Sequence, residues 1–127
     1  MDKNVVGWFE IPVLDLDRSR KFYEVVLGLK LECHTMGPLE MAWFPWIEDA
    51  VGSPGSLVQQ EEFYKPSADG VQIYFTSPSG DTANELARVE PAGGKLLRPK
   101  TLISEDVGYY GLLLDTEGNS IAIHSLK

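Results

Sequence analysis

The sequence predicts an α+β fold made of two similar halves, each running strand, helix, strand, strand, strand. A shift of about half the chain aligns Trp8 with Gln72 and Asp17 with Asp81, so a strand followed by a capped helix occurs twice. In both halves glycine is expected to end the helix, and a Lys-Leu pair follows shortly after it. Because 43% of the residues are hydrophobic, the two halves can share one buried core.

The first half opens with a strand over residues 5–13, which are rich in β-branched and aromatic side chains. Asp15 or Asp17 is expected to cap a helix that ends at Leu27, because Gly28 readily adopts the left-handed conformation that terminates helices. A strand, a Gly-Pro turn, a returning strand, a loop and a fourth strand are then expected over residues 31–36, 37–38, 39–46, 47–55 and 56–60.

The second half repeats this order with its own signals. Asp81 is expected to cap the helix, and Pro99 predicts that the strand after the helix is short or bent. Gly118 suits the loop of the final hairpin. The expected strand, helix and three further strands cover residues 71–76, 82–89, 96–103, 109–114 and 120–126.

These elements predict one domain over residues 1–127, with module one at 1–60, a linker at 61–70 and module two at 71–127. The eight strands are expected to form one curved mixed sheet with both helices on its convex side. Side chains from both modules would then point into the concave side. A hollow of this kind predicts a small-molecule site.

Charge and composition argue against several functions. Eleven Lys and Arg against 19 Asp and Glu give a net charge of −8, which disfavours nucleic-acid binding because no basic face is evident. Cys33 is the single cysteine, so an internal disulfide is impossible. Since no stretch has the length and apolarity of a secretory leader or a membrane span, the chain is expected to be cytoplasmic and not membrane-bound.

Several short motifs resemble a known superfamily. They are Gly7 to Asp17, Phe22-Tyr23, Leu27-Gly28-Leu29 and Asp115-Thr116-Glu117-Gly118-Asn119. These motifs are similar to those of the vicinal oxygen chelate superfamily, which includes glyoxalases, bleomycin-resistance proteins and extradiol dioxygenases. The resemblance implies a fold of paired βαβββ modules and a homodimer.

A second group of motifs resembles a subgroup described as related to lactoylglutathione lyase. They are Phe44-Pro45-Trp46, Gly55-Ser56-Leu57-Val58, Asp69-Gly70-Val71, Ala92-Gly93-Gly94-Lys95 and Ile123-His124-Ser125. The reactions of this subgroup are largely unassigned, so this resemblance indicates kinship and not a substrate.

The superfamily resemblance implies a divalent metal held by His, Glu or Gln on the first and last strands of each module. The matching positions here are Trp8, Gln59 (Gln60 if the register slips by one), Gln72 and Ala122. An indole and a methyl group cannot coordinate a metal, and two neutral amides are poor ligands alone. The sequence therefore predicts no metal and no cofactor, with a divalent metal on other ligands as the alternative.

Glu10 and His124 are the candidate catalytic residues. His124 lies two positions after Ala122, so it faces the same side of its strand and is either a base or ligand, or a rim histidine bonded to a backbone group. Glu10 shares a strand face with Trp8 and is either a site carboxylate or an exposed edge residue. The candidate ligand-binding residues are Trp8, Glu10, Gln59, Gln72, Tyr74 and His124.

Three functions fit these residues. The first is a small-molecule-binding, glyoxalase-like protein without the four-ligand metal site. The second is a metal-dependent lyase or isomerase of the lactoylglutathione lyase type that uses Glu10, Gln72 and His124 as ligands. The third is a binder that sequesters an antibiotic on aromatic side chains. The residues leave open whether any reaction is catalysed.

Overall fold

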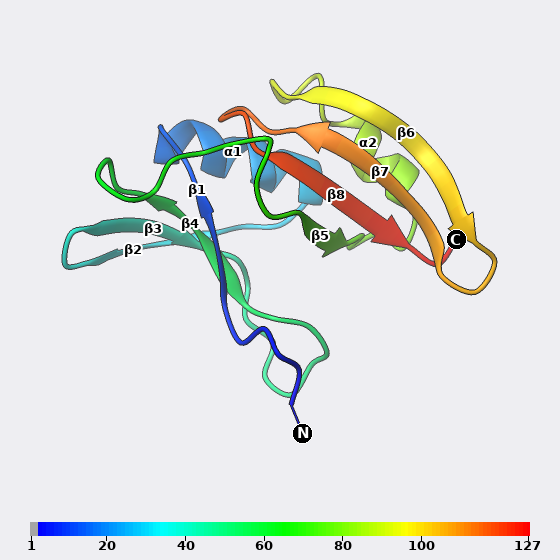
Figure 1. The fold of residues 1–127 in the computed structure, drawn as a ribbon, viewed down its shortest axis with the longest axis horizontal. Coiled ribbons are helices and arrows are strands. Elements are labelled where there is room, and N and C mark those ends of the chain that lie inside the picture. The colour runs from blue at the N-terminus through cyan, green and yellow to red at the C-terminus, as the bar shows by residue number, and fades with distance from the viewer. Residues whose placement is uncertain (1–2) are drawn as a thin grey trace.

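The computed structural model describes residues 3–127, which form two helices and eight strands in two four-stranded sheets (Figure 1). The first sheet has the order β1 (Phe9–Pro12), β4 (Gly55–Gln59), β3 (Leu39–Trp43), β2 (Glu32–Met36). The second has the order β5 (Ile73–Thr76), β8 (Ser120–Ser125), β7 (Gly108–Leu114), β6 (Lys95–Ser104). The helices are α1 (Leu16–Leu27) and α2 (Thr82–Ala87).

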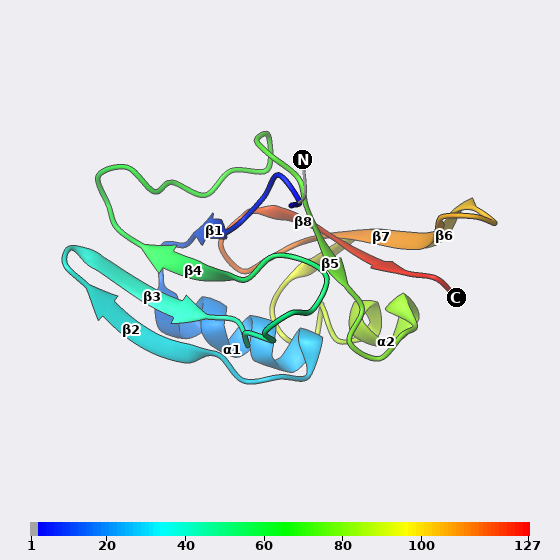
Figure 2. The same cartoon turned by 90° about the horizontal axis from the view of Figure 1, so that it is seen from below.

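The predicted α+β class and the repeated strand order are confirmed, but the eight strands do not form one continuous sheet. In each sheet the first strand is an edge strand that pairs in parallel with the last strand of its module, β1 with β4 and β5 with β8. Figure 2 shows both helices on the same side of the molecule, as predicted. Among residues 3–127, no helix has the length and apolarity needed to cross a membrane.

Helix α1 has the predicted ends. The Asp15 side chain accepts a hydrogen bond from the N–H of Arg18, and Gly28 adopts φ 69° at the other end. The side chains of Phe22, Tyr23, Val26 and Leu27 are buried, so one face of the helix packs on the core.

Helix α2 begins as predicted, because the Asp81 side chain accepts from the N–H of Ala83. The helix ends at Ala87 and is shorter than the predicted 82–89, and turns continue the chain to the fully buried Val89. The strand β6 departs from the prediction in the other direction. It is ten residues long, and its pairing with β7 shifts register on both sides of Pro99, so it is irregular but not short.

Four aromatic side chains join the two modules in one core. Phe75 of β5 packs against Phe44 at 5.2 Å and against Phe9 and Tyr23 at 5.9 Å between ring centroids. Because three of these rings come from the first half of the chain and one from the second, the core is shared.

The loop between β7 and β8 clamps helix α1 from the other module. Both Leu14 and Asp15 donate backbone N–H bonds of 2.9 Å to Glu117 Oε1, and the Arg18 guanidinium donates two bonds of 2.8 Å to the same carboxylate. Burial alone would raise the pKa of Glu117, but the hydrogen bonds from Arg18, Thr116 and the two backbone groups lower it to about 2.

The same loop also holds the end of β1. Asn119 donates a side-chain hydrogen bond of 2.8 Å to the carbonyl oxygen of Pro12. Asp115 accepts a bond of 2.6 Å from the buried hydroxyl of Tyr23 and further bonds from the N–H groups of Glu117 and Asn119. The Asp-Thr-Glu-Gly-Asn motif is therefore an architectural element that docks module two onto module one.

Candidate functional site

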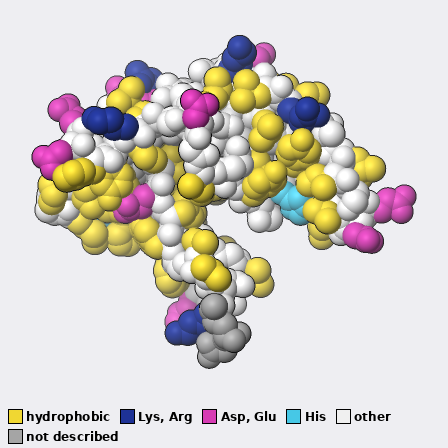
Figure 3. Space-filling view, in the orientation of Figure 1, with side chains coloured by type: hydrophobic (Ala, Val, Ile, Leu, Met, Phe, Trp, Pro, Cys, Tyr) yellow, Lys and Arg dark blue, Asp and Glu magenta, His cyan; other side chains and the backbone are white. Residues whose placement is uncertain are grey.

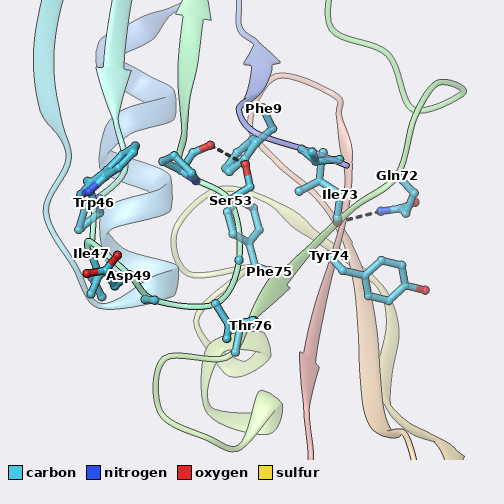
Figure 4. Close-up of a pocket in the computed structure, with 16 residues that line it drawn as sticks. Phe9, Trp46, Ile47, Asp49, Ser53, Gln72, Ile73, Tyr74, Phe75 and Thr76 are labelled. Atoms are coloured by element: carbon cyan, nitrogen blue, oxygen red, sulfur yellow. Dashed lines mark hydrogen bonds between the residues drawn. The ribbon is translucent and has the colours of Figure 1, made fainter. Parts of the chain in front are cut away.

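A cavity of about 640 Å³ lies between β5 and the loop that connects β3 to β4 (Figure 4). Trp46, Ile47 and Asp49 stand on the loop side, Gln72 and Tyr74 on the β5 side, with Phe9 and Phe75 between the two sides. The other lining residues are Val6, Pro45, Ala50, Val51, Gly52, Ser53, Pro54, Ile73 and Thr76. The volume is typical of small-molecule sites, and the lining is predominantly apolar.

The local sequence explains why the connecting loop stands away from the sheet. Pro45 lacks the N–H that would continue the β3 ladder, so β3 ends at Trp43. Gly52 has φ 109°, and Asp49 has φ 62°, a left-handed conformation that aspartate tolerates better than most residues. Trp46 therefore sits on a loop and keeps 65% of its surface exposed.

The cavity carries little charge. Asp49 is the only Asp, Glu, Lys or Arg among the 16 lining residues. On the face of the molecule seen in Figure 3, hydrophobic patches alternate with isolated charged side chains, and Lys and Arg do not gather there.

Of the residues predicted to bind ligand, Gln72 and Tyr74 line the cavity. The Gln72 amide donates to the carbonyl oxygen of Ser120 at 3.1 Å and accepts from its hydroxyl at 3.2 Å, so it is held in place. The Tyr74 side chain is 54% exposed, and its ring lies 6.4 Å from that of Tyr110.

Trp8 and Glu10 lie together on β1 and its approach, outside the residues that line this cavity. The indole N–H of Trp8 donates to Glu10 at 3.3 Å, and the Tyr64 hydroxyl donates to the same carboxylate at 2.8 Å. The bond to Glu10 raises the pKa of Tyr64. Trp8 also packs edge-on against Trp43, with 5.5 Å between ring centroids.

Gln59 points to a different side of the sheet from Trp8 and Glu10. It shares a face with the buried Leu57, and its side-chain oxygen accepts a bond of 2.7 Å from the N–H of Leu16. Gln59 thus satisfies a free N–H at the start of α1. Its neighbour Gln60 accepts from the N–H of Phe63 instead.

His124 lies on the β8 face that it shares with Ala122, paired in register with Tyr110 and Thr76. Its Nε2 contacts the carbonyl oxygen of Val107, so this nitrogen carries the proton and donates. The backbone-bonded alternative considered for His124 is the arrangement found. Within residues 3–127, no three His, Cys, Asp or Glu side chains come together as a metal-binding group.

The loop at residues 47–55 was not predicted to form one side of the cavity. Residues 47–55 were expected only to form a connection, and Trp46 was expected at the end of a strand. The proline at position 45 was the available signal, because it ends the β3 ladder and places the next two large apolar side chains, Trp46 and Ile47, on a loop.

Comparison with known proteins gives consistent matches. Residues 6–45 match the family described as bleomycin resistance protein-like N-terminal. A glyoxylase-like domain-containing protein of Didymella fabae is 28% identical over 121 residues, which cover 93% of this chain and 91% of that protein.

Solved structures share the fold at low sequence identity. A glyoxalase/bleomycin resistance protein from Albidiferax ferrireducens has a TM-score of 0.68 at 18% identity, covering 94% of this chain and 97% of that one. TnmS3, an antibiotic binding protein from a Streptomyces species, has a TM-score of 0.68 at 19% identity and 98% coverage of both chains. Glyoxalase I from Zea mays has the same TM-score at 19% identity, and the match spans 94% of this chain and 45% of that enzyme.

Proposed function

We propose that this chain is a member of the vicinal oxygen chelate superfamily and that it binds a small organic molecule in the cavity beside β5. Its fold and the match of residues 6–45 to a bleomycin resistance protein-like family support the first part of this proposal. The observation that carries the proposal is the cavity itself. Its volume of about 640 Å³ lies in the range of small-molecule sites, and its lining includes the aromatic side chains of Phe9, Trp46 and Phe75. The similarity to an antibiotic binding protein along 98% of both chains supports binding as the function.

We further propose that binding needs no metal. The four positions that resemblance assigns to metal ligands hold an indole, a methyl group and two amides, and this donor set does not fit a divalent ion. The Gln59 oxygen faces α1, and the Gln72 amide is bonded to Ser120. Glu10 and His124 have hydrogen-bond partners of their own in Tyr64 and Val107.

A thermal-shift screen of small molecules tests the binding proposal. A compound that binds only the folded protein raises the melting temperature and is recovered chemically unchanged. Trp46→Ala is expected to weaken the binding of that compound at least tenfold, because it removes the largest side chain on the loop side of the cavity. Calorimetry measures the two affinities.

Phe63→Ala is the matched control for this experiment, because Phe63 is 78% exposed and lies outside the cavity lining. It is expected to leave the affinity unchanged. Equal losses from the two variants, or the absence of any stabilising compound in the screen, would contradict the proposal.

The metal-dependent alternative is tested by dialysis against nickel, cobalt, zinc and manganese, followed by metal analysis. We expect no stoichiometric metal and no turnover of the hemithioacetal formed by methylglyoxal and glutathione. Stoichiometric metal that is lost in Glu10→Ala or His124→Ala would overturn the metal-free proposal, and turnover lost in the same variants would favour the lyase or isomerase.

Three expectations from the sequence stay predictions. A homodimer is tested by sedimentation over a range of protein concentrations, and a cytoplasmic location by cell fractionation. The narrower kinship with the subgroup related to lactoylglutathione lyase is tested by whether relatives that share Phe44-Pro45-Trp46 also lack metal-binding side chains at the four positions.

A further inference from the structure

We propose that the ligand is a short, positively charged peptide, or a molecule with a peptide-like backbone, that pairs with the open edge of β5 as an added strand. The inference rests on the proposed function, because it names the class of molecule that fills the same cavity. Three features of the described residues support it: an unpaired strand edge, the place of that edge in the cavity, and the charge of the lining.

The open edge follows from the pairing of the second sheet. β5 pairs with β8 and forms the end of the sheet order. The N–H of Ser77 donates to the carbonyl oxygen of His124 at 2.8 Å, which fixes the alternation along the strand. Ile73 and Phe75 therefore direct their backbone groups toward β8, and Tyr74 and Thr76 direct theirs away from it.

This edge borders the cavity, although Tyr74 and Thr76 are themselves exposed. Residues 72–76 all line the cavity, opposite Trp46 and Ile47 of the loop (Figure 4). An open strand edge presents a row of unpaired N–H and C=O groups, which is a template for pairing with another extended chain. An extended peptide supplies alternating C=O and N–H groups at the spacing that such an edge requires.

The dimensions limit the length of this peptide. A strand rises about 3.4 Å per residue, so the five β5-side residues span roughly 16 Å. An added strand on this edge is therefore about four or five residues long. The cavity volume of about 640 Å³ fits a ligand of small-molecule size and excludes a folded protein domain.

The charge of the cavity lining favours a positively charged ligand. Asp49 is the only charged side chain among the lining residues that the structure describes, and the whole chain has a net charge of −8. An anionic ligand would meet repulsion without a compensating Lys or Arg in the cavity. A cationic ligand gains attraction to Asp49 and to the ring face of Trp46.

The test uses the tetrapeptide amide Ala-Leu-Ala-Leu-NH₂, which carries a single positive charge at its amino terminus. Calorimetry measures its affinity, and amide hydrogen exchange by NMR locates its contacts. The expected result is slower exchange, by about tenfold or more, at the amides of Tyr74 and Thr76. The amides of Ile73 and Phe75 already bond to β8 and are expected to change little, as is the outer edge of β6 at the other end of the sheet.

Two changes to the ligand separate backbone pairing from apolar binding. Methylating two alternate amide nitrogens on the edge that faces β5 is expected to weaken binding about tenfold or more, because it removes two donors. Acetylating the amino terminus is expected to weaken binding about two- to fivefold, the range of an exposed ion pair. Asp49→Asn is expected to remove this difference between the free and acetylated peptides.

Thr76→Pro makes the matching change in the protein. Because the N–H of Thr76 points away from β8, proline at this position removes a donor from the open edge without breaking the ladder. The variant is expected to keep its melting temperature within a few degrees and to lose about fivefold or more in affinity for the peptide. If the variant does not fold, the methylated peptide still decides the question.

Failure of this inference is distinguishable from failure of the proposed function. Binding of the methylated and parent peptides with equal affinity, or protection of the β6 edge to the same extent as β5, would overturn the peptide inference. So would a non-peptide compound that depends on Trp46 when the tetrapeptide does not bind, although the proposed function would then stand. If no compound stabilises the protein, both fail.

Discussion

At the scale of single residues, Glu117 decides how module two is attached to helix α1. The carboxylate accepts hydrogen bonds from the N–H groups of Leu14 and Asp15 and from the Arg18 guanidinium, and these bonds favour its charged form. Its folded-state pKa of about 2 lies below the ordinary value of 4.5. A lowered carboxyl pKa contributes stability that is present above the unfolded pKa and is lost as the pH falls through the folded pKa.

The first prediction concerns acid stability. Glu117→Gln is expected to lower the free energy of unfolding at pH 7 by about 3 kcal/mol, the value of a shift of this size. The difference between variant and wild type is expected to shrink between about pH 4.5 and pH 2, because there the Glu117 carboxyl of the unfolded chain gains a proton while that of the folded protein stays ionised. Urea unfolding at pH 7, 4 and 3 measures it, and a difference that stays constant with pH would contradict the assignment.

A second prediction concerns the buried hydroxyl beside this loop. Tyr23→Phe is expected to lower the free energy of unfolding by about 1–3 kcal/mol, because the buried Asp115 carboxylate loses a hydrogen bond of 2.6 Å. Tyr64→Phe also removes a hydroxyl bonded to a carboxylate, Glu10, but at a partly exposed position, so its cost should be smaller. Urea midpoints of the two variants compare them directly, and an equal loss would mean that burial does not set the cost.

Residue by residue, the sequence predicted the local roles better than the long-range ones. The Asp15 cap and the Gly28 stop depend on neighbours within four positions, so the sequence pattern alone indicates them. The bond from Leu16 to Gln59 joins residues 43 positions apart, and its donor is a free helix N–H that could have been satisfied by water. The sequence therefore could not tell which face of β4 Gln59 would take.

At the scale of elements, the close packing of β6 against its neighbours depends on a glycine, Gly94, just before the strand. A Cβ added to Gly94 would lie 2.6 Å from the carbonyl oxygen of Leu114 and 2.6 Å from the ring of Phe22. The backbone oxygen belongs to the β7 strand and cannot move aside without disturbing the ladder. Gly94 thus permits the start of β6 to approach both β7 and helix α1.

The third prediction follows from this contact. Gly94→Ala is expected to lower the free energy of unfolding by about 1–3 kcal/mol, the usual cost of overpacking. Gly7→Ala is the matched control, because a Cβ at Gly7 would meet nothing within 4 Å and the residue does not have a positive φ. Thermal or urea unfolding of both variants tests the contrast, and comparable stability of the two would show that the β6–β7 contact adjusts freely.

The type and order of the helices and strands were predicted correctly. The prediction for β6 was less accurate, because the effect of a proline depends on whether its strand lies at the edge of a sheet. Pro99 indicated a broken strand, because proline removes a ladder donor. As an edge strand, β6 loses little from a missing donor and instead shifts register around the proline. The cavity loop was not predictable in the same way, because the pairing of β5 and the position of Trp46 beside it depend on how the modules pack.

At the scale of the whole molecule, the two modules are similar in topology but not independent in energy. Phe75 of module two packs against Phe9, Tyr23 and Phe44 of module one, and the loop at residues 115–119 supplies the hydrogen bonds at the start of α1. Each half alone would expose part of this aromatic core. A chain of about 60 residues buries too little apolar surface to compensate for such a loss.

The last prediction is therefore that neither half folds alone. Residues 1–65 and 66–127, expressed separately, are each expected to lack the dispersed amide resonances and the cooperative unfolding transition of the full chain. Mixing the two fragments is expected to restore the fold, because the ring contacts and the Glu117 bonds join residues on different fragments. Glu117→Gln in the second fragment should weaken this recovery at pH 7, whereas Phe63→Ala in the first should not, since Phe63 is largely exposed. A separately folded fragment with a sharp melting transition would show that each module has a sufficient core of its own, and that the shared aromatic cluster is not what holds the domain together.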